Sequence, residues 1–364
     1  MLRQFGELKE LTIFKRWERL NERAMKRNFY VSLAGALVLA LGLAISTSAQ
    51  GRTTTTAEAA GQLPPLPASD GVMFVEMRRL LTEVMPRVLA DDPARAASIN
   101  ADIDLFKTRT GIDARAFERV AVGVRFTNPS PEVTKIDHVV AIANGTFNAG
   151  ALAAAGRLAS KGQYQETKHG GKTVYVFNIN ERIKIFGVSP RMNVTNLAMS
   201  VLDRNTLAVG EPEAVRAAID ASTGRGRISP ALVALARSNP NAVVGFGANM
   251  PQSLLKKVEG LGNPELERAV MSIKQFYGSL SPSANGFDVL ATMRAADADS
   301  ARNLSDTVTA LKSLAAFAVS QLSGERRRLA ESAVQSLKIE VQGTDVNLRL
   351  SFAQTDIATM LRVF

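Results

Sequence analysis

The feature that most constrains this chain is an apolar run near its N-terminus. From Phe29 to Ile45 there are 17 consecutive residues without a charge. Lys26 and Arg27 precede the run, and the small residues of 46–49 follow it. A basic flank, an apolar core and a small-residue exit are the order of a secretory signal. A bilayer core needs about 20 apolar residues, so the run also suffices for a slightly short membrane anchor.

The charges around the run predict its orientation. Eight Lys or Arg residues precede it, whereas Arg52 is the only one between its end and Arg78. Basic residues are retained on the cytoplasmic side, so the chain after the run should be exported. We therefore expect an extracytoplasmic protein, either periplasmic or anchored to the cytoplasmic membrane with its C-terminal domain outside.

The basic leader, 1–28, is longer than the leader of an ordinary signal, and two explanations remain open. Translation could begin at Met25, which gives a compact signal cleaved near Ala49. Alternatively, Met1 is the start and 2–23 is a cytoplasmic helix whose apolar residues recur at helical spacing. We prefer the cleaved signal. If the signal is not cleaved, the inner membrane is a partner through residues 29–45.

The amino-acid composition limits the kinds of functional site that this chain can form. Hydrophobic residues make up 46% and charged residues 21%, which is typical of a folded protein. Cysteine is absent, which excludes disulfides, thiolate metal sites and a cysteine nucleophile. Beyond residue 50 there are 36 basic and 30 acidic residues, so the excess there is 36 − 30 = +6. This excess is weak support for an anionic partner, and we expect no nucleic acid.

Element order indicates a repeated body. After a signal region or anchor (29–49) and a Thr- and Pro-rich linker (50–67), two stretches, 68–226 and 227–364, show a similar order of strand, helices, strands, long helix, hairpin and helix. We interpret this as a diverged tandem duplication. The expected fold is α+β, with two related units of mainly antiparallel sheet and amphipathic helices packed on one face.

Local patterns place most of the elements. The clearest hairpin has alternating apolar residues in 337–341 and 346–352, on either side of a Gly-containing turn. A second hairpin is centred on Gly170–Gly171. Proline at a first helical position predicts helices that start near 212, 230 and 264. We expect further helices over 251–259, 264–277 and 299–322, and strands over 242–248 and 286–294.

The two histidines, His138 and His169, lack the local spacing of a metal pair. His169 falls in an expected turn, where a polar residue needs no function. His138 follows Asp137 in an expected strand, so a His–Asp relay with an unidentified serine is conceivable for a hydrolase. No G-x-S-x-G elbow supports it, because 187–191 reads GVSPR. We therefore assign no catalytic residue, cofactor site or metal site.

Three other patterns have structural interpretations. Gly245 and Gly247 follow a strand, but position 250 is Met where a dinucleotide fingerprint needs glycine, so close packing is favoured. Asp102 and Asp104 lie on different faces of an expected helix and should be solvated. The only basic concentration outside the leader is formed by Arg225, Arg227 and the triplet Arg326–Arg327–Arg328, which would oppose the helix dipole slightly.

Four segments carry a family resemblance: LPASD at 66–70, TGID at 110–113, LDRNTLAVG at 202–210 and AVRAAID at 214–220. With these turn and packing motifs, residues 66–352 resemble a group of uncharacterised bacterial envelope proteins, a domain of unknown function. The resemblance implies an export segment and a repeated α+β ectodomain. It transfers no catalytic residues.

The leading hypothesis is an exported, non-enzymatic binding or structural protein of the bacterial cell envelope, which could hold an apolar ligand, an envelope lipid or a partner protein. One alternative is a hydrolase that uses His138 with a carboxylate. Another is a membrane-anchored sensor or scaffold with 2–23 as its cytoplasmic part. Oligomeric state is not indicated by the sequence.

Overall fold

The computed structural model describes residues 64–90, 92–110, 113–130, 133–160, 162–178, 196–251, 255 and 263–363. All of these residues belong to the part of the chain that follows Ile45. The expected leader, the signal or anchor at 29–49 and most of the linker lie outside the described residues. Within the described residues, no helix is long and apolar enough to cross a membrane.

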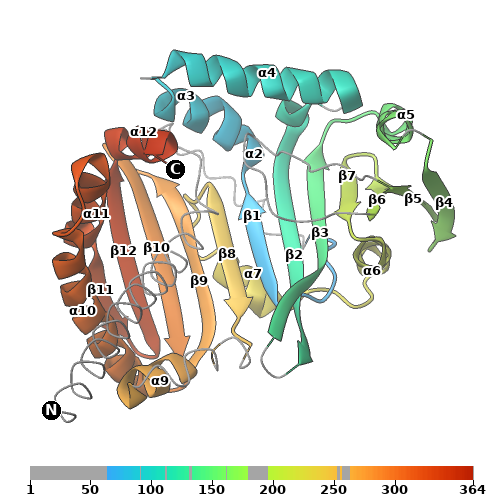
Figure 1. Ribbon diagram of the computed structural model, residues 1–364. Helices are drawn as coiled ribbons and strands as arrows, with labels where there is room; N and C mark the ends of the chain where they lie inside the picture. The colour runs from blue at the N-terminus through green and yellow to red at the C-terminus, as the bar shows by residue number, and fades with distance from the viewer. Residues whose placement is uncertain are drawn as a thin grey trace, which may run out of the picture. The chain divides into compact units, whose positions relative to one another are not determined.

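Twelve strands in the described part of the chain form one sheet, in which each pair of neighbours is antiparallel. The strands are β1 (Gly71–Val75), β2 (Phe117–Ser130), β3 (Val133–Gly145), β4 (Tyr164–His169), β5 (Lys172–Asn178), β6 (Asn196–Asp203), β7 (Thr206–Gly210), β8 (Val244–Asn249), β9 (Ile273–Pro282), β10 (Gly286–Ala295), β11 (Lys338–Gln342) and β12 (Asp345–Ala353). Their order is β11-β12-β10-β9-β8-β1-β2-β3-β7-β6-β5-β4 (Figure 1). The α+β class with a large antiparallel sheet is therefore confirmed.

Helices connect these strands. They are α2 (Met77–Arg79), α3 (Met85–Val88), α4 (Pro93–Thr110), α5 (Ala149–Ala159), α6 (Pro212–Ser222), α7 (Pro230–Ala236), α9 (Pro264–Met271), α10 (Ala298–Val319), α11 (Gly324–Ser336) and α12 (Gln354–Val363), with a π-helical turn, Leu80–Val84, between α2 and α3. The predicted starts of α6, α7 and α9 are correct, since each has proline at its first position.

Helices pack on both sides of the sheet, which corrects the prediction that they cover one face. On the side that we call the α6 face, α6 and α7 pack against residues such as Ile142 and Ala208. On the opposite side, the α10 face, α5 packs against Leu207. Neighbouring residues of a strand point to opposite sides, and both Leu207 and Ala208 are buried. A strand such as β7, with apolar residues on both sides, therefore needs cover on both faces.

Direct cross-strand pairs connect the two ends of the α10 face. Leu207 pairs with Ala143 in β3, and the register carries this side through Val75 in β1 and Val244 in β8. It continues to Val289 in β10. On this side of the sheet, α10 and α9 bury Ala295 of β10 and Val346 of β12. Pairs that lie directly opposite share a face, so α5 and α10 lie on the same side of the sheet.

One strand was not predicted. The predicted helix over 264–277 ends at Met271, and β9 begins at Ile273. The segment after Ile273 has apolar residues at spacings that fit a helix, but β9 lies between β8 and β10 and is bonded to both. The hydrogen bonds that β9 forms with β8 and with β10 outweigh the weak helical preference of its own residues. The helix predicted over 251–259 lies almost wholly outside the described residues.

Strand order also bears on the expected duplication. Outward from the central pair β1 and β8, the orders are β1-β2-β3-β7-β6 and β8-β9-β10-β12-β11. In both directions the third strand pairs with the second strand of a later hairpin. This correspondence is consistent with a repeat, although both predicted stretches build a single sheet. The duplication and the boundary between 226 and 227 stay predictions.

Candidate functional site

The candidate site is built on a β-bulge in β3. Gly123 pairs with Val140, and two residues later Arg125 pairs with Asp137, three residues back along β3. The extra residue on β3 locally breaks the ladder, as a bulge does. His138 lies in it with φ of 50°, the only non-glycine residue with positive φ in the described part of the chain. Such a backbone is uncommon for a residue with a side chain and marks sites of interest.

Glu211 holds this bulge in place. Its carboxylate accepts hydrogen bonds from the backbone amides of His138 (3.1 Å) and Val139 (3.3 Å), and its own amide donates to the Val139 carbonyl (2.9 Å). Glu211 is also the N-cap residue of α6. One side chain therefore satisfies the amides that the bulge removes from the ladder and fixes the start of α6 against β3.

Asp137 binds the same amide. Its Oδ1 accepts from the His138 amide at 3.0 Å, and this hydrogen bond is the main reason that the pKa of Asp137 lies below its ordinary value. Neither carboxylate reaches the imidazole, and no described residue forms a hydrogen bond with that ring. The geometry of the predicted His–Asp relay, in which the carboxylate orients the ring, is absent from the described residues.

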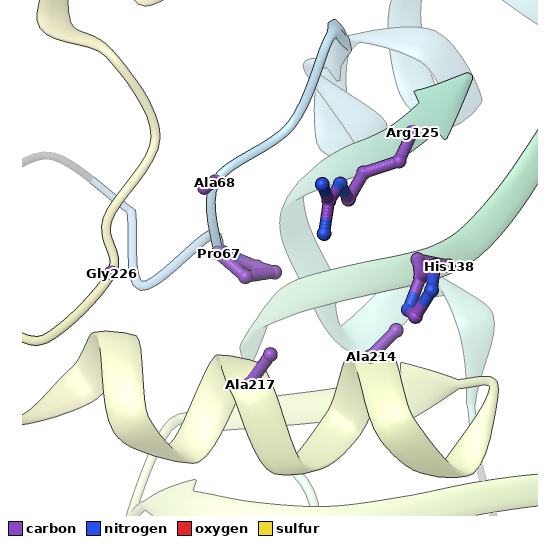
Figure 2. Close-up of a pocket in the computed structure, with 7 residues that line it drawn as sticks. All are labelled: Pro67, Ala68, Arg125, His138, Ala214, Ala217 and Gly226. Atoms are coloured by element: carbon purple, nitrogen blue, oxygen red, sulfur yellow. The ribbon is translucent and has the colours of Figure 1, made fainter. Parts of the chain in front are cut away.

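The His138 ring and the Arg125 guanidinium point into one small cavity of about 110 Å³ (Figure 2). The remaining lining residues are Pro67, Ala68, Ala214, Ala217 and Gly226. Two backbone bonds close the wall opposite the strands: Ala68 N donates to Gly226 O at 2.7 Å, and Ile228 N donates to Leu66 O at 3.0 Å. The cavity thus lies between β2 and β3, α6, and the segment that precedes β1.

The polar side chains that line this cavity are basic, and two carboxylates, those of Asp137 and Glu211, lie beside the bulge. Arg125 is a permanent cation and forms no hydrogen bond or ion pair with any described residue, and His138 becomes a cation when protonated. The lining residues provide no hydroxyl, thiol or carboxylate. Asp137 lies opposite Arg125 in the ladder and weakens the local positive field. The basic side chains can bind a small anionic group, and the described lining has no hydroxyl for the serine of the expected relay.

The second histidine is not the free turn residue that the sequence suggested. His169 Nε2 lies 3.1 Å from Asp220 Oδ2, and Arg225 donates to the other carboxylate oxygen at 2.7 Å. Arg227 donates to the Ala221 carbonyl at 2.7 Å. The His169 contact joins the end of β4 to the C-terminal end of α6, and the two arginine bonds join the loop that follows α6 to the same helix end. His138 lies at the opposite end of α6, so the structure does not bring the two histidines together.

The remaining predicted candidates have structural surroundings. Gly245 and Gly247 face α7, and a Cβ at Gly245 would lie 2.0 Å from the Ala236 carbonyl oxygen, which agrees with the packing interpretation. Asp104 accepts from Arg115 at 2.8 Å, and Asp102 is exposed. The GVSPR segment lies outside the described residues. No group of three or more metal-ligating side chains gathers among the residues that the structure describes.

A polar cluster on the α6 face was missed. Arg294 in β10 binds both oxygens of Asp345 at 2.7 and 2.9 Å, and the Tyr277 hydroxyl donates to Asp345 at 2.8 Å. The Arg294 guanidinium lowers the pKa of Asp345, whereas burial raises the pKa of Tyr277. The alternating apolar pattern placed the strand at 346–352, one residue after Asp345, and the pairing of Asp345 with Arg294 is visible only in the β10–β12 register. We interpret this cluster as structural.

The described residues define an α+β protein with a twelve-stranded antiparallel sheet and a small cavity, lined by two basic side chains, at a bulge. No known family model matches the sequence, and no curated protein matches it. Solved structures titled as crystal forms III and I of TP0453 are similar over 84% and 83% of this chain and 100% and 98% of their own, with TM-scores of 0.42 and 0.41 at 9% and 10% identity. Likeness of this degree carries no inference about function.

Proposed function

We propose that this chain is an exported, non-enzymatic binding protein of the bacterial cell envelope, and that the cavity beside His138 holds a small anionic group such as a carboxylate or phosphate. The binding part of the proposal is carried by one observation: Arg125 and His138 share a cavity whose described lining has no hydroxyl, thiol or carboxylate. The location is supported by the apolar run at 29–45 and by the family resemblance.

The size of the cavity limits the ligand. Small-molecule sites usually measure about 300–1,000 Å³. The cavity beside His138 measures about 110 Å³ and is lined partly by backbone, so it can enclose only a few heavy atoms. The apolar ligand considered from the sequence would not fit there. An anionic end of a larger molecule is compatible, because the remainder could extend into solvent past the exposed Arg125.

Binding is tested by titrating the purified full chain with inorganic phosphate and with acetate, followed by isothermal calorimetry and by NMR of the imidazole. Arg125→Gln should weaken binding by about 10- to 100-fold, because a hydrogen bond to a charged group contributes about 1.5–3 kcal/mol. Arg225→Gln is the matched control, since Arg225 is an exposed arginine whose guanidinium pairs with Asp220. Equal affinity of wild type and Arg125→Gln would refute the anion site.

The role of His138 needs a variant that keeps the bulge. His138→Asn removes the ring, and asparagine tolerates positive φ better than most residues. We expect weaker anion binding with an unchanged unfolding midpoint. A loss of stability in this variant would mean that His138 holds the bulge and that its binding role is unsupported.

Location is tested separately with a reporter fused to the C-terminus. A reporter accessible only from the cytosol would overturn the envelope assignment and leave the cavity chemistry standing. Protein sequencing of the mature N-terminus distinguishes a cleaved signal from the anchored sensor or scaffold, in which 29–45 is retained.

The hydrolase alternative uses His138 with a carboxylate, and its serine-relay form requires a hydroxyl that reaches the His138 ring. None of the described lining residues supplies one. If the wild type hydrolyses any member of a broad ester and peptide panel and His138→Asn abolishes that activity, the enzymatic alternative replaces the binding proposal.

A further inference from the structure

The second half of α10 carries an apolar stripe that faces solvent. Leu314 is 58% exposed and Phe317 is 73% exposed, and Ala310 is exposed on the same side. Spacings of four and three residues place these side chains in one row on a helix. The opposite side of α10 carries Leu304 and Val319, both buried. The second half of α10 therefore carries apolar side chains on its solvent side as well as on its buried side.

The exposed stripe is confined to one end of the helix. Toward the N-terminus of α10 the same side carries Asp299, Asn303 and Asp306, and all three are exposed. From Ser313 to Gly324 there is no charged residue. The solvent side of α10 therefore changes from acidic to apolar along its length. Its apolar part lies at the end that leads into α11.

Arginines follow this apolar end directly. Arg326, Arg327 and Arg328 lie in the first turns of α11, which packs beside α10 (Figure 1), and all three are exposed. Arg327 pairs with Glu331 at 2.7 Å, and Arg328 donates to Thr359 at 3.3 Å. Arg326 has no hydrogen bond or ion pair among the described residues.

Charge at this end is positive. Residues 310–331 contain four basic and two acidic side chains, so the sum is 4 − 2 = +2. Three arginines at a helix N-terminus oppose the helix dipole and so cost α11 some stability. Exposed Leu314 and Phe317 on α10, together with exposed arginines at the start of the neighbouring helix α11, have the composition of a surface that meets an apolar layer bordered by anions.

We propose that this α10–α11 tip (Ala310, Leu314, Phe317 and Arg326–Arg328) is a peripheral docking site for an anionic phospholipid bilayer. Leu314 and Phe317 would enter the boundary between headgroups and acyl chains, while the arginines pair with lipid phosphates. Arginine suits this contact because its planar guanidinium binds phosphate with two parallel hydrogen bonds. A second copy of this chain is disfavoured as the occupant, since self-association would bring two positive tips together.

The proposal gains its cellular meaning from the proposed envelope location, but it does not depend on the cavity beside His138. Its test must be local, because the apolar run at 29–45 would by itself carry the full chain to any vesicle. The chain contains no cysteine, so a single introduced cysteine gives one labelled position. Ala310→Cys reports on the tip, and Asn303→Cys is a matched control two helical turns earlier on the same side.

The full chain with an environment-sensitive dye at either position is incorporated into vesicles of phosphatidylglycerol and phosphatidylethanolamine that contain a lipid-borne quencher. We expect a blue-shifted, quenched signal for the label at 310 and a nearly unchanged one for the label at 303. In the protein labelled at position 310, the additional changes Leu314→Ser and Phe317→Ser should abolish the blue shift of the dye. Arg326→Gln with Arg327→Gln should lower the ratio of docked to undocked protein by about 20-fold, at roughly fivefold for each charge near an anionic surface.

Controls separate docking from unfolding and from self-association. Arg302→Gln removes an exposed arginine at the far end of α10 and should leave the shift unchanged. Circular dichroism checks that each variant is folded. An unshifted 310 label in anionic vesicles, or an equal shift in purely phosphatidylcholine vesicles, would overturn the proposal. A concentration-dependent shift without lipid would assign the tip to a second copy instead.

Discussion

Gly245→Ala should destabilise the fold, because β8 and α7 approach each other without room for a side chain. A Cβ at Gly245 would lie 2.0 Å from the carbonyl oxygen of Ala236, whereas a Cβ at Gly247 would lie 3.3 Å from its nearest atoms on α7. The obstacle at Gly245 is helix backbone, so α7 as a whole must move. Leu232, Val233 and Ala236 on α7 are all buried, so this movement loosens the core.

The expected change in the free energy of unfolding of Gly245→Ala is the difference between two opposing contributions. Forcing a methyl group into a packed core costs about 1–3 kcal/mol, and a rigid obstacle favours the upper end. Replacing glycine lowers the entropy of the unfolded chain and returns about 0.4–1 kcal/mol. We expect Gly245→Ala to lose about 2 kcal/mol, which corresponds to a decrease in melting temperature of roughly 4–8 °C. Gly247→Ala should stay within about 1 kcal/mol of wild type.

The measurement is urea unfolding followed by far-ultraviolet circular dichroism. Tryptophan fluorescence is unsuitable, because the single tryptophan, Trp17, belongs to the leader. Gly247→Ala serves as the matched control on the same strand and the same face. If the two variants have equal midpoints, the close approach of α7 does not limit stability, and the packing explanation of these glycines is refuted.

Three further predictions follow from the sites described above. Arg294 lowers the pKa of Asp345, so the stability that this carboxylate contributes is present above about pH 4 and is lost as pH falls through the lowered value. In Asp345→Asn, the free energy of unfolding should therefore change less between neutral and acidic pH than it does in the wild type. If the free energy of unfolding of both proteins depends on pH in the same way, this prediction is wrong. The pKa of Tyr277 is raised, so its contribution is complete below about pH 10 and is lost as pH rises through the raised value. Ultraviolet titration should show one of four tyrosines ionising late, and Tyr277→Phe should lack that step; a late step that survives in the variant would assign it to another tyrosine. His138→Val should lose about 1–2 kcal/mol in thermal unfolding because a β-branched residue resists positive φ, and equal stability of His138→Val and His138→Asn would argue against the left-handed bulge.

The sequence predicted elements whose signal is local. The alternation placed β11 and β12 within a residue or so, and the prolines placed the starts of α6, α7 and α9, although the end of α9 was predicted six residues too late. β9 was missed because its identity depends on β8 and β10, not on its own residues. The pairing of β1 with β8 joins Gly71 to Ala248, and no local pattern encodes a contact at that separation.

The candidate site was predictable only in part. His138 stood out because histidine is rare in this chain, but its expected partner was Asp137 in a catalytic relay. The bulge, the Glu211 carboxylate that holds it and the convergence on Arg125 all depend on the register between β2 and β3. No local pattern indicated that Glu211, the N-cap residue of α6, would bind backbone amides of β3 and make no side-chain bond to its own helix.

Contacts across the predicted boundary between 226 and 227 explain why we expect 68–226 and the residues after 226 to unfold as one cooperative unit. α7 follows the predicted boundary between 226 and 227, yet Leu232 and Ala236 belong to the core cluster that contains Ile142, Ala218 and Leu66. The segment before β1 is fixed to the loop after α6 by backbone bonds at Gly226 and Ile228. These contacts also form the wall of the cavity beside His138. A ligand that orders this wall would therefore stabilise packing on both sides of the boundary, because both sides share that core.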